Sequence, residues 1–266
     1  MNILQDSSKR GNFTEGNSIH FNPTTRRGNM KIYLSLLLSW LFFILNASAS
    51  TQAETDANCP LCQHTFKTTM DMSGTQNDMR LDLKPLGAIA APWRVPVCPK
   101  CHFVIFDQKL PQAELDKCKV IVAGEAFKKL DKRASYHLLG RLFEGLEKPA
   151  QERAFIFLKA SWQEEEEAAH LKENLELSLK YFDLFLKEVE AQPKPEVQQQ
   201  VDTALLVKGE LLRRLGRFDE AKTHFTNLLT KKDFKDSFPG KLAAFQIQLC
   251  DNKDDKIHRV SELKQP

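Results

Sequence analysis

The sequence predicts a mostly α-helical protein, in which an array of antiparallel helical hairpins follows a small β-rich module. The first observation is that apolar residues recur about every 3.6 positions from Pro111 onward, with Pro and Gly between the segments. The second is a pair of C-x-x-C motifs that precedes this region. Hydrophobic residues make up 42% of the 266 residues, which is enough to form a core, so we expect one or two globular domains.

The net charge of the chain is concentrated at its beginning. Residues 1–49 contain five basic and two acidic residues, so the totals of 38 and 35 leave 33 basic and 33 acidic residues for the remainder. Proteins that bind nucleic acid usually carry a basic surface, because the release of counterions from phosphates drives their affinity. The balanced remainder therefore argues against a nucleic-acid partner.

Residues 30–49 have the layout of a secretory signal peptide. Lys31 is the charged start, residues 33–45 form an apolar run, and residues 47–49 read Ala-Ser-Ala, a small-residue cleavage site. The preceding residues 1–29 are polar and unlike the start of a signal peptide. We interpret Met30 as the true start and residues 1–29 as a disordered or mis-assigned leader.

An uncleaved membrane tether is the alternative for the same segment. A membrane-spanning helix needs about 20 apolar residues, and the run within residues 32–47 is shorter. Cleavage is therefore favoured. Both interpretations place residues 51–266 outside the cytoplasm, either as a periplasmic or secreted protein or as a membrane-anchored protein that faces out of the cytoplasm.

Residues 51–110 are predicted to form the β-rich module around four cysteines. Cys59 and Cys62 belong to one Cys-Pro-x-Cys motif, and Cys98 and Cys101 belong to a second one, with 35 residues between the two motifs. Each motif brings two thiolates to one side of a tight turn, and two such turns complete a tetrahedral zinc site with Zn–S bonds of about 2.3 Å. The long connection between the two motifs adds little to the entropic cost of closing this loop. A four-thiolate site is closed to substrate, so we expect a structural zinc in a zinc-ribbon-like module.

Other chemistries at these cysteines stay open. Disulfides are compatible with an exported chain. Cys98, Cys101 and His102 spell C-x-x-C-H, the attachment motif of c-type haem. The motif at Cys59 also resembles that of thiol oxidoreductases, although the polar residues before it do not look like the buried strand of such enzymes. His64 and His102 follow the two motifs closely and are alternate metal ligands.

Residues 111–253 are predicted to form the helical domain, and residues 254–266 a polar tail. Glu164 begins an acidic run that we interpret as a solvated helix face. Cys118 and Cys250 are interpreted as small buried apolar residues, with a disulfide between them left open. The predicted helices cover residues 112–129, 133–146, 149–166, 168–191, 197–214, 217–230 and 238–250.

Residues 202–230 look like one tetratricopeptide repeat, in which two antiparallel helices pack closely together. Small residues fall at the helix crossing, in the turn and at the tight contact, and aromatic residues begin the second helix and fill the gap between the two. The preceding helix pair, residues 149–190, keeps the helical pattern of a repeat but lacks its signature residues, so we interpret it as a degenerate repeat. The positions that carry the match are Gly209, Gly216, Phe218, Ala221 and Phe225.

The order of these features resembles a bacterial family of uncharacterised proteins, known as a domain of unknown function. Its members have an N-terminal zinc-ribbon-like knob with two CPxC motifs and a C-terminal tetratricopeptide-like array. The chain departs from the family pattern in its export signal and at His102, where members usually have Gly. The resemblance covers residues 59–250 and implies an architecture but no reaction. It rests on Cys59, Pro60, Cys62, Phe66, Cys98, Pro99, Cys101, Phe103 and the run 209–221.

We therefore expect an exported binding or scaffold protein, and not an enzyme. A structural zinc would fix the first module, and the helical repeats would engage a protein or peptide partner, because stacked repeats form concave binding surfaces. The sequence contains no H-E-x-x-H motif, no G-x-S-x-G motif and no Gly-rich phosphate loop. The alternative is a c-type haem or thiol redox protein that uses Cys98, Cys101 and His102.

Overall fold

The computed structural model describes residues 50–193 and 195–263. The predicted signal peptide, the alternative tether and the start at Met30 lie outside these residues. None of the helices in the described part of the chain combines the length and the hydropathy that a membrane crossing requires.

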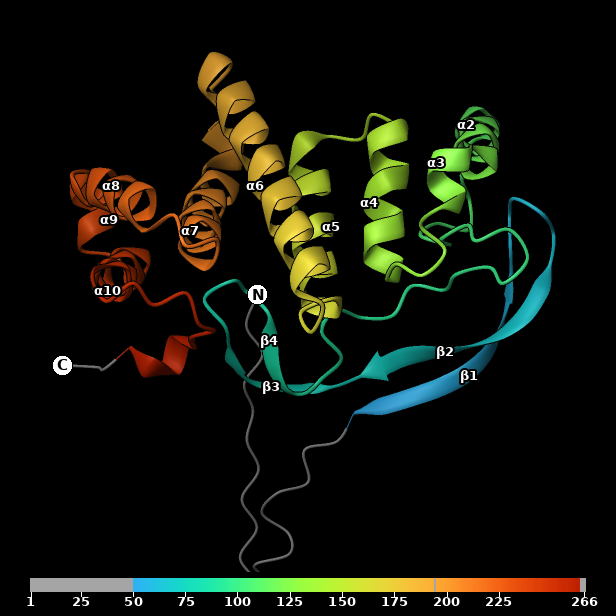
Figure 1. Ribbon diagram of the computed structural model, residues 1–266, viewed down its shortest axis with the longest axis horizontal. Coiled ribbons are helices and arrows are strands. Elements are labelled where there is room, and N and C mark those ends of the chain that lie inside the picture. Colours follow the sequence, from blue (N-terminus) through green and yellow to red (C-terminus); the bar gives the residue numbers. More distant parts are fainter. Residues whose placement is uncertain (1–49, 194, 264–266) are drawn as a thin grey trace, which may run out of the picture. The chain divides into compact units, whose positions relative to one another are not determined.

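Two small antiparallel sheets come before the helices (Figure 1). β1 (Thr51–Asn58) pairs with β2 (Thr65–Ser73), and β3 (Thr75–Met79) pairs with β4 (Pro85–Ala88). The polar composition of β1 gave no sign of a buried strand, and apart from Ala57 its side chains are indeed largely exposed. The first sheet is therefore a ribbon with little core of its own.

The helices follow the predicted segments closely. The single helix predicted over 112–129 is wrong in one respect, because Gly124 adopts an extended conformation (φ −69°, ψ 142°) and divides it in two. A short helix before the last long one was not predicted. The helices are α2 (Gln112–Ala123), α3 (Glu125–Lys128), α4 (Ser135–Gly145), α5 (Ala150–Gln163), α6 (Ala168–Ala191), α7 (Gln198–Arg214), α8 (Phe218–Leu229), α9 (Lys232–Lys235) and α10 (Phe238–Asp251), with short 3-10 turns at Pro195–Val197 and Val260–Glu262.

The longer helices pack one after another as an array. α4 contacts α5, α5 contacts α6, α6 contacts α7, α7 contacts α8, and α8 contacts α10 (Figure 1). Phe157, Phe182 and Phe225 have no exposed surface and belong to the largest hydrophobic cluster. The predicted fold class is thus confirmed: a mostly helical array of packed helices follows a small antiparallel β module that contains a four-cysteine cluster.

The β module and the first helices share a second hydrophobic cluster. Cys98 and Phe103 from the module pack in it with Leu142 of α4. Tyr136 of α4 also donates a hydrogen bond to the backbone carbonyl of Trp93 (2.9 Å). The expected boundary between residues 110 and 111 is therefore not a break in packing.

The segment expected to be a polar tail contacts the body of the protein. Arg259 forms a β-bridge with Arg80, and Val260 packs beside Leu81. The buried guanidinium of Arg213 donates to the backbone carbonyl of Lys256 (2.8 Å). These contacts fix residues 254–263 against β3, the β3–β4 turn and α7.

The interpretation of the acidic run as a solvated face is wrong for its first two residues. Glu164 is 7% exposed and forms an ion pair with Arg133 (2.8 Å), and it also accepts a hydrogen bond from Asn174 (2.7 Å). Glu165 pairs with Arg80 and Lys84, both at 2.7 Å. The first two residues of the run are buried or half-buried because their basic partners come from other parts of the chain.

Candidate metal centre and the adjoining pocket

The two Cys-Pro-x-Cys motifs fold into equivalent turns, or knuckles. In the first knuckle the N–H of Cys59 donates to the carbonyl of His64 (3.0 Å), and the N–H of Gln63 donates to the carbonyl of Cys59 (2.9 Å). In the second knuckle the N–H of Cys98 donates to the carbonyl of Phe103 (2.9 Å), and that of His102 to the carbonyl of Cys98 (2.8 Å). The same short segment is thus built twice, and each copy presents two sulfur atoms.

The knuckles face each other and bring the four sulfur atoms together. The Sγ atoms of Cys59, Cys62, Cys98 and Cys101 all lie within 4.8 Å of one another. Cys59 Sγ is 3.7 Å from Cys101 Sγ, and Cys62 Sγ is 3.6 Å from Cys98 Sγ. A tetrahedron with metal–sulfur bonds of about 2.3 Å has edges of about 3.8 Å, whereas a disulfide bond is about 2.05 Å long. The cluster therefore has the spacing of a metal centre.

The backbone of each knuckle stabilises thiolates. Burial raises the pKa of Cys62, but the N–H of His64 and the neighbouring thiols lower it further, so the net shift is downward. Burial raises the pKa of Cys59 and of Cys101, even though backbone N–H groups donate to both sulfur atoms. Cys59 and Cys98 have no exposed surface, while Cys62 and Cys101 are half-buried. A cation between the four sulfurs would compensate the charge that burial disfavours.

The two histidines considered as alternate ligands lie outside the cluster. Within the described residues, the group of potential ligands at this point contains the four cysteines alone. The ring of His64 stacks on Phe66, with 6.1 Å between the ring centroids. His102 is exposed, and its φ of 59° lies in the left-handed region. That conformation favours Gly, which is the residue that the resemblance described above leads us to expect at this position.

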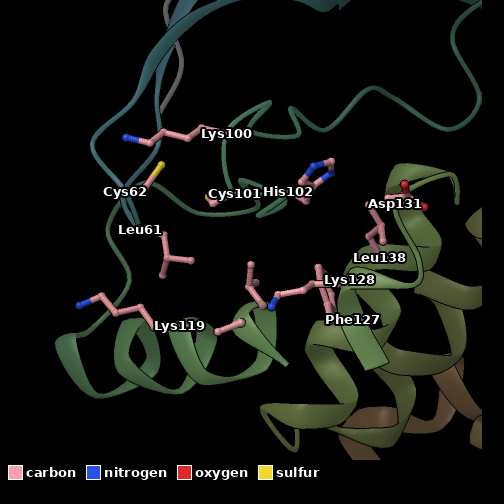
Figure 2. Close-up of a pocket in the computed structure, with 12 residues that line it drawn as sticks. Leu61, Cys62, Lys100, Cys101, His102, Lys119, Phe127, Lys128, Asp131 and Leu138 are labelled. Atoms are coloured by element: carbon pink, nitrogen blue, oxygen red, sulfur yellow. The ribbon is translucent and has the colours of Figure 1, made fainter. Parts of the chain in front are cut away.

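A pocket of about 590 Å³ lies directly beside the second-knuckle sulfur of Cys101 (Figure 2). It opens between the two knuckles on one side and α2, α3 and α4 on the other. Its buried lining residues are mostly apolar, and its three lysines are exposed and so lie at its mouth. The lining residues are Leu61, Cys62, Lys100, Cys101, His102, Lys119, Val122, Ala123, Phe127, Lys128, Asp131 and Leu138. Sequence reasoning missed this pocket, since its lysines look like ordinary solvated residues until the fold gathers them.

The other two cysteines are buried in different places. Cys118 of α2 belongs to the cluster shared with the β module, and Cys250 of α10 belongs to the cluster of the helical array. Burial raises the pKa of each thiol to about 11. Both residues thus serve as small apolar groups, and the structure does not bring them together.

The repeat signature lies in the α7–α8 hairpin. A Cβ atom at Gly209 would overlap the ring of Phe225, and Ala221 is fully buried between the helices. Gly216, in the turn, has a φ of 72°, and Phe218 packs against the core from the start of α8. A similar contact that sequence reasoning missed joins α4 and α5, where a Cβ atom at Gly140 would overlap the ring of Phe157.

Together these features define the class of protein: a helical-array protein whose first helices are packed on a β module with a four-cysteine, metal-type centre. The model of a family described as "Uncharacterized protein conserved in bacteria (DUF2225)" matches residues 53–244, well over half of the chain, and so the chain belongs to this family. A search of curated proteins returned no match. A search of solved structures also returned none.

Proposed function

We propose that this chain is an exported binding or scaffold protein, not an enzyme, with a structural zinc ion held by Cys59, Cys62, Cys98 and Cys101. The observation that carries the proposal is the mutual approach of the four Sγ atoms within 4.8 Å. Four thiolates complete the tetrahedral coordination of zinc and leave no position for a reacting water, so the metal would stabilise the fold. Because the module shares its core with α4, the metal would also support the helical array.

The redox alternatives have less support. Covalent haem at Cys98, Cys101 and His102 would require the sulfur of Cys98 to reach a porphyrin, but that residue has no exposed surface and touches Cys62. A thiol oxidoreductase places its first cysteine at the N-terminus of a helix, which lowers the thiol pKa. Here the segment after Cys62 runs into strand β2.

The proposed partner is a protein or peptide. Support comes from hollows on the surface that carry both apolar and charged side chains, as peptide-binding surfaces do. One is the pocket beside the metal centre, and another, of about 470 Å³, lies along α6 and is lined by Leu184 and Arg217. Leu184 is 37% exposed. Export would bring both surfaces to partners outside the cytoplasm.

The metal is tested by its content in the purified protein, together with a titration of thiols under denaturing conditions. The proposal expects about one zinc per chain, released together with four additional reactive thiols. Iron in place of zinc would contradict the proposal. So would a metal-free protein with fewer titratable thiols than cysteines, because the missing thiols would then be in disulfides. A haem absorbance after expression in a host with haem-attachment machinery would favour the redox alternative.

Partner binding is tested by photo-crosslinking in a bacterial host. A photoreactive amino acid is introduced at Leu184 on the array, at Lys119 in the lining of the pocket beside the cysteine cluster, and at Met72 on the exposed ribbon as the control position. A discrete adduct at Leu184 or Lys119, but not at Met72, is the expected result. Equal labelling at all three positions, or none at any, would speak against a binding protein.

A further inference from the structure

The mouth of the pocket beside the metal centre carries an excess of positive charge. Lys100 comes from the second knuckle, Lys119 from α2 and Lys128 from α3, whereas Asp131 is the one carboxylate among the described lining residues (Figure 2). The chain after residue 49 has equal numbers of basic and acidic residues. This local excess is therefore a property of the pocket and not of the protein as a whole.

The lysines are available to a ligand. Lys119 pairs with Asp116 (3.1 Å) and Lys128 with Glu125 (2.8 Å), and in both pairs each partner is more than half exposed. Exposed pairs one helical turn apart contribute only about 0.3–0.5 kcal/mol. Exchanging these partners for the carboxylates of a ligand would therefore cost little.

The interior of the pocket is suited to an apolar group. Leu61, Val122, Phe127 and Leu138 line it, and its volume of about 590 Å³ falls within the range of about 300–1,000 Å³ that is usual for ligand sites. Aromatic side chains act most often as anchors in hollows of this kind, because they bury a large area with few rotatable bonds.

We propose that this pocket binds a peptide segment of a partner protein, in which an aromatic side chain is flanked by carboxylates. The aromatic group enters the apolar interior and the carboxylates meet the lysines at the mouth. Because the three ammonium groups stand on three different elements, they suit charges spread along a chain better than the single headgroup of a fatty acid. Residues 1–49, with five basic and two acidic residues, do not complement the pocket.

This inference rests on the proposed binding function and gives it a site and a ligand chemistry. The probe is a pentapeptide of one tryptophan with two acidic residues on each side, titrated into the zinc-loaded full chain and followed by backbone amide NMR shifts. Two control peptides replace the tryptophan by alanine or the acidic residues by lysines. Laurate, titrated separately, represents a free amphiphilic carboxylate.

The decisive variants reverse charge on α2 and at the end of α3. Lys119→Glu/Lys128→Glu should weaken binding of the acidic peptide by at least about tenfold, whereas Lys117→Glu/Lys129→Glu, exposed residues that do not line the pocket, should weaken it by less than about twofold. Zinc content and circular dichroism of both variants establish that they fold. Shifts should concentrate in the second knuckle, α2 and α3.

Equal weakening in both variants would overturn the proposal, because binding would then reflect net charge alone. Binding of laurate without binding of the acidic peptide would overturn it in favour of a free amphiphile. A crosslink from Leu184 but none from Lys119, with no peptide binding, would refute the pocket while the binding function stands. A protein that is purified without chelator, contains no zinc and still binds the peptide would refute the metal assignment and leave the pocket intact.

Discussion

The ring of Phe225 occupies the space that any side chain at Gly209 would need. Helices α7 and α8 approach each other closely at this point, and the ring of Phe225 leaves no room for a Cβ atom at Gly209. Phe225 is fully buried, so its ring cannot move aside into solvent. The contact sets the separation of the two helices.

Gly209→Ala should therefore lower the free energy of unfolding by about 1–3 kcal/mol, the usual cost of overpacking a core. Urea denaturation followed by helical circular dichroism measures it. Phe225→Leu in the same chain should reduce the cost of the alanine. Gly216→Ala is the control, because its cost of about 1–2 kcal/mol comes from the left-handed backbone and should be unaffected by Phe225→Leu. If Phe225→Leu reduced the cost of both substitutions equally, the overlap with Phe225 would not be the cause of the loss of stability in Gly209→Ala.

Cys98→Ser should abolish stoichiometric metal binding and lower the thermal stability of the chain. The reason is that a four-sulfur site with one thiolate missing loses affinity, and metal binding contributes to folding. Metal content and thermal unfolding give the two readouts. Cys118→Ser is the matched control, since Cys118 is equally buried in the same cluster but lies outside the sulfur group. A Cys98→Ser protein that retains one zinc per chain would refute the site.

His102→Gly should keep the metal and raise stability by about 1 kcal/mol, because the residue is exposed and holds a left-handed conformation. Gln63→Gly at the equivalent position of the first knuckle (φ 58°) should behave in the same way. Metal content and urea denaturation check both variants. Loss of zinc from His102→Gly alone would instead identify His102 as a ligand.

Glu164 should make the stability of the fold depend on pH in acid. Burial raises the pKa of this carboxyl, but Arg133, the N–H of Ala134 and Asn174 lower it more, to about 2. Because the pKa in the folded state lies below the unfolded value of about 4.3, the contribution of Glu164 is complete above that unfolded value and is lost as the pH falls toward 2.

Glu164→Gln should cost about 3–5 kcal/mol at neutral pH, because it removes the buried partner of Arg133 and leaves that guanidinium only the 38% exposed carboxylate of Glu173. The difference in unfolding free energy between wild type and variant should shrink between pH 4.5 and 2. Comparing the two proteins removes the shared effect of releasing the proposed zinc in acid. Exposed Glu167, changed to Gln, is the control and should leave the pH profile unaltered.

Much of the fold could be predicted from local patterns. The knuckles follow from two identical spacings of cysteine, and the ends of α6 coincide with those that the periodicity predicts. The contact of Gly140 with Phe157 repeats that of Gly209 with Phe225, with a separation of 17 instead of 16 residues. A search that allowed one residue of slack would have found it.

The remaining features depend on residues that meet only in the folded chain. The partner of Glu164 in its buried ion pair, Arg133, comes from the segment before α4. Nothing near Glu164 in the sequence distinguishes it from the exposed acid at Glu167. The lysines of the pocket beside the cysteine cluster come from three elements, and each is unremarkable in its own segment. Long-range charge pairing of this kind leaves no periodic signal.

The contacts of the last residues with the β module change how the array should fold. An open stack of helical hairpins can fray from either end, since each repeat touches only its neighbours. Here Ser261 donates a hydrogen bond to Asp78, which lies 183 positions earlier in the sequence, and Arg80 donates one to Glu165, which lies 85 positions later. Such contacts close the chain into a loop whose parts must assemble together, which slows folding relative to a stack of the same length. We expect residues 50–263 to unfold as one cooperative unit, without the gradual loss of terminal helices.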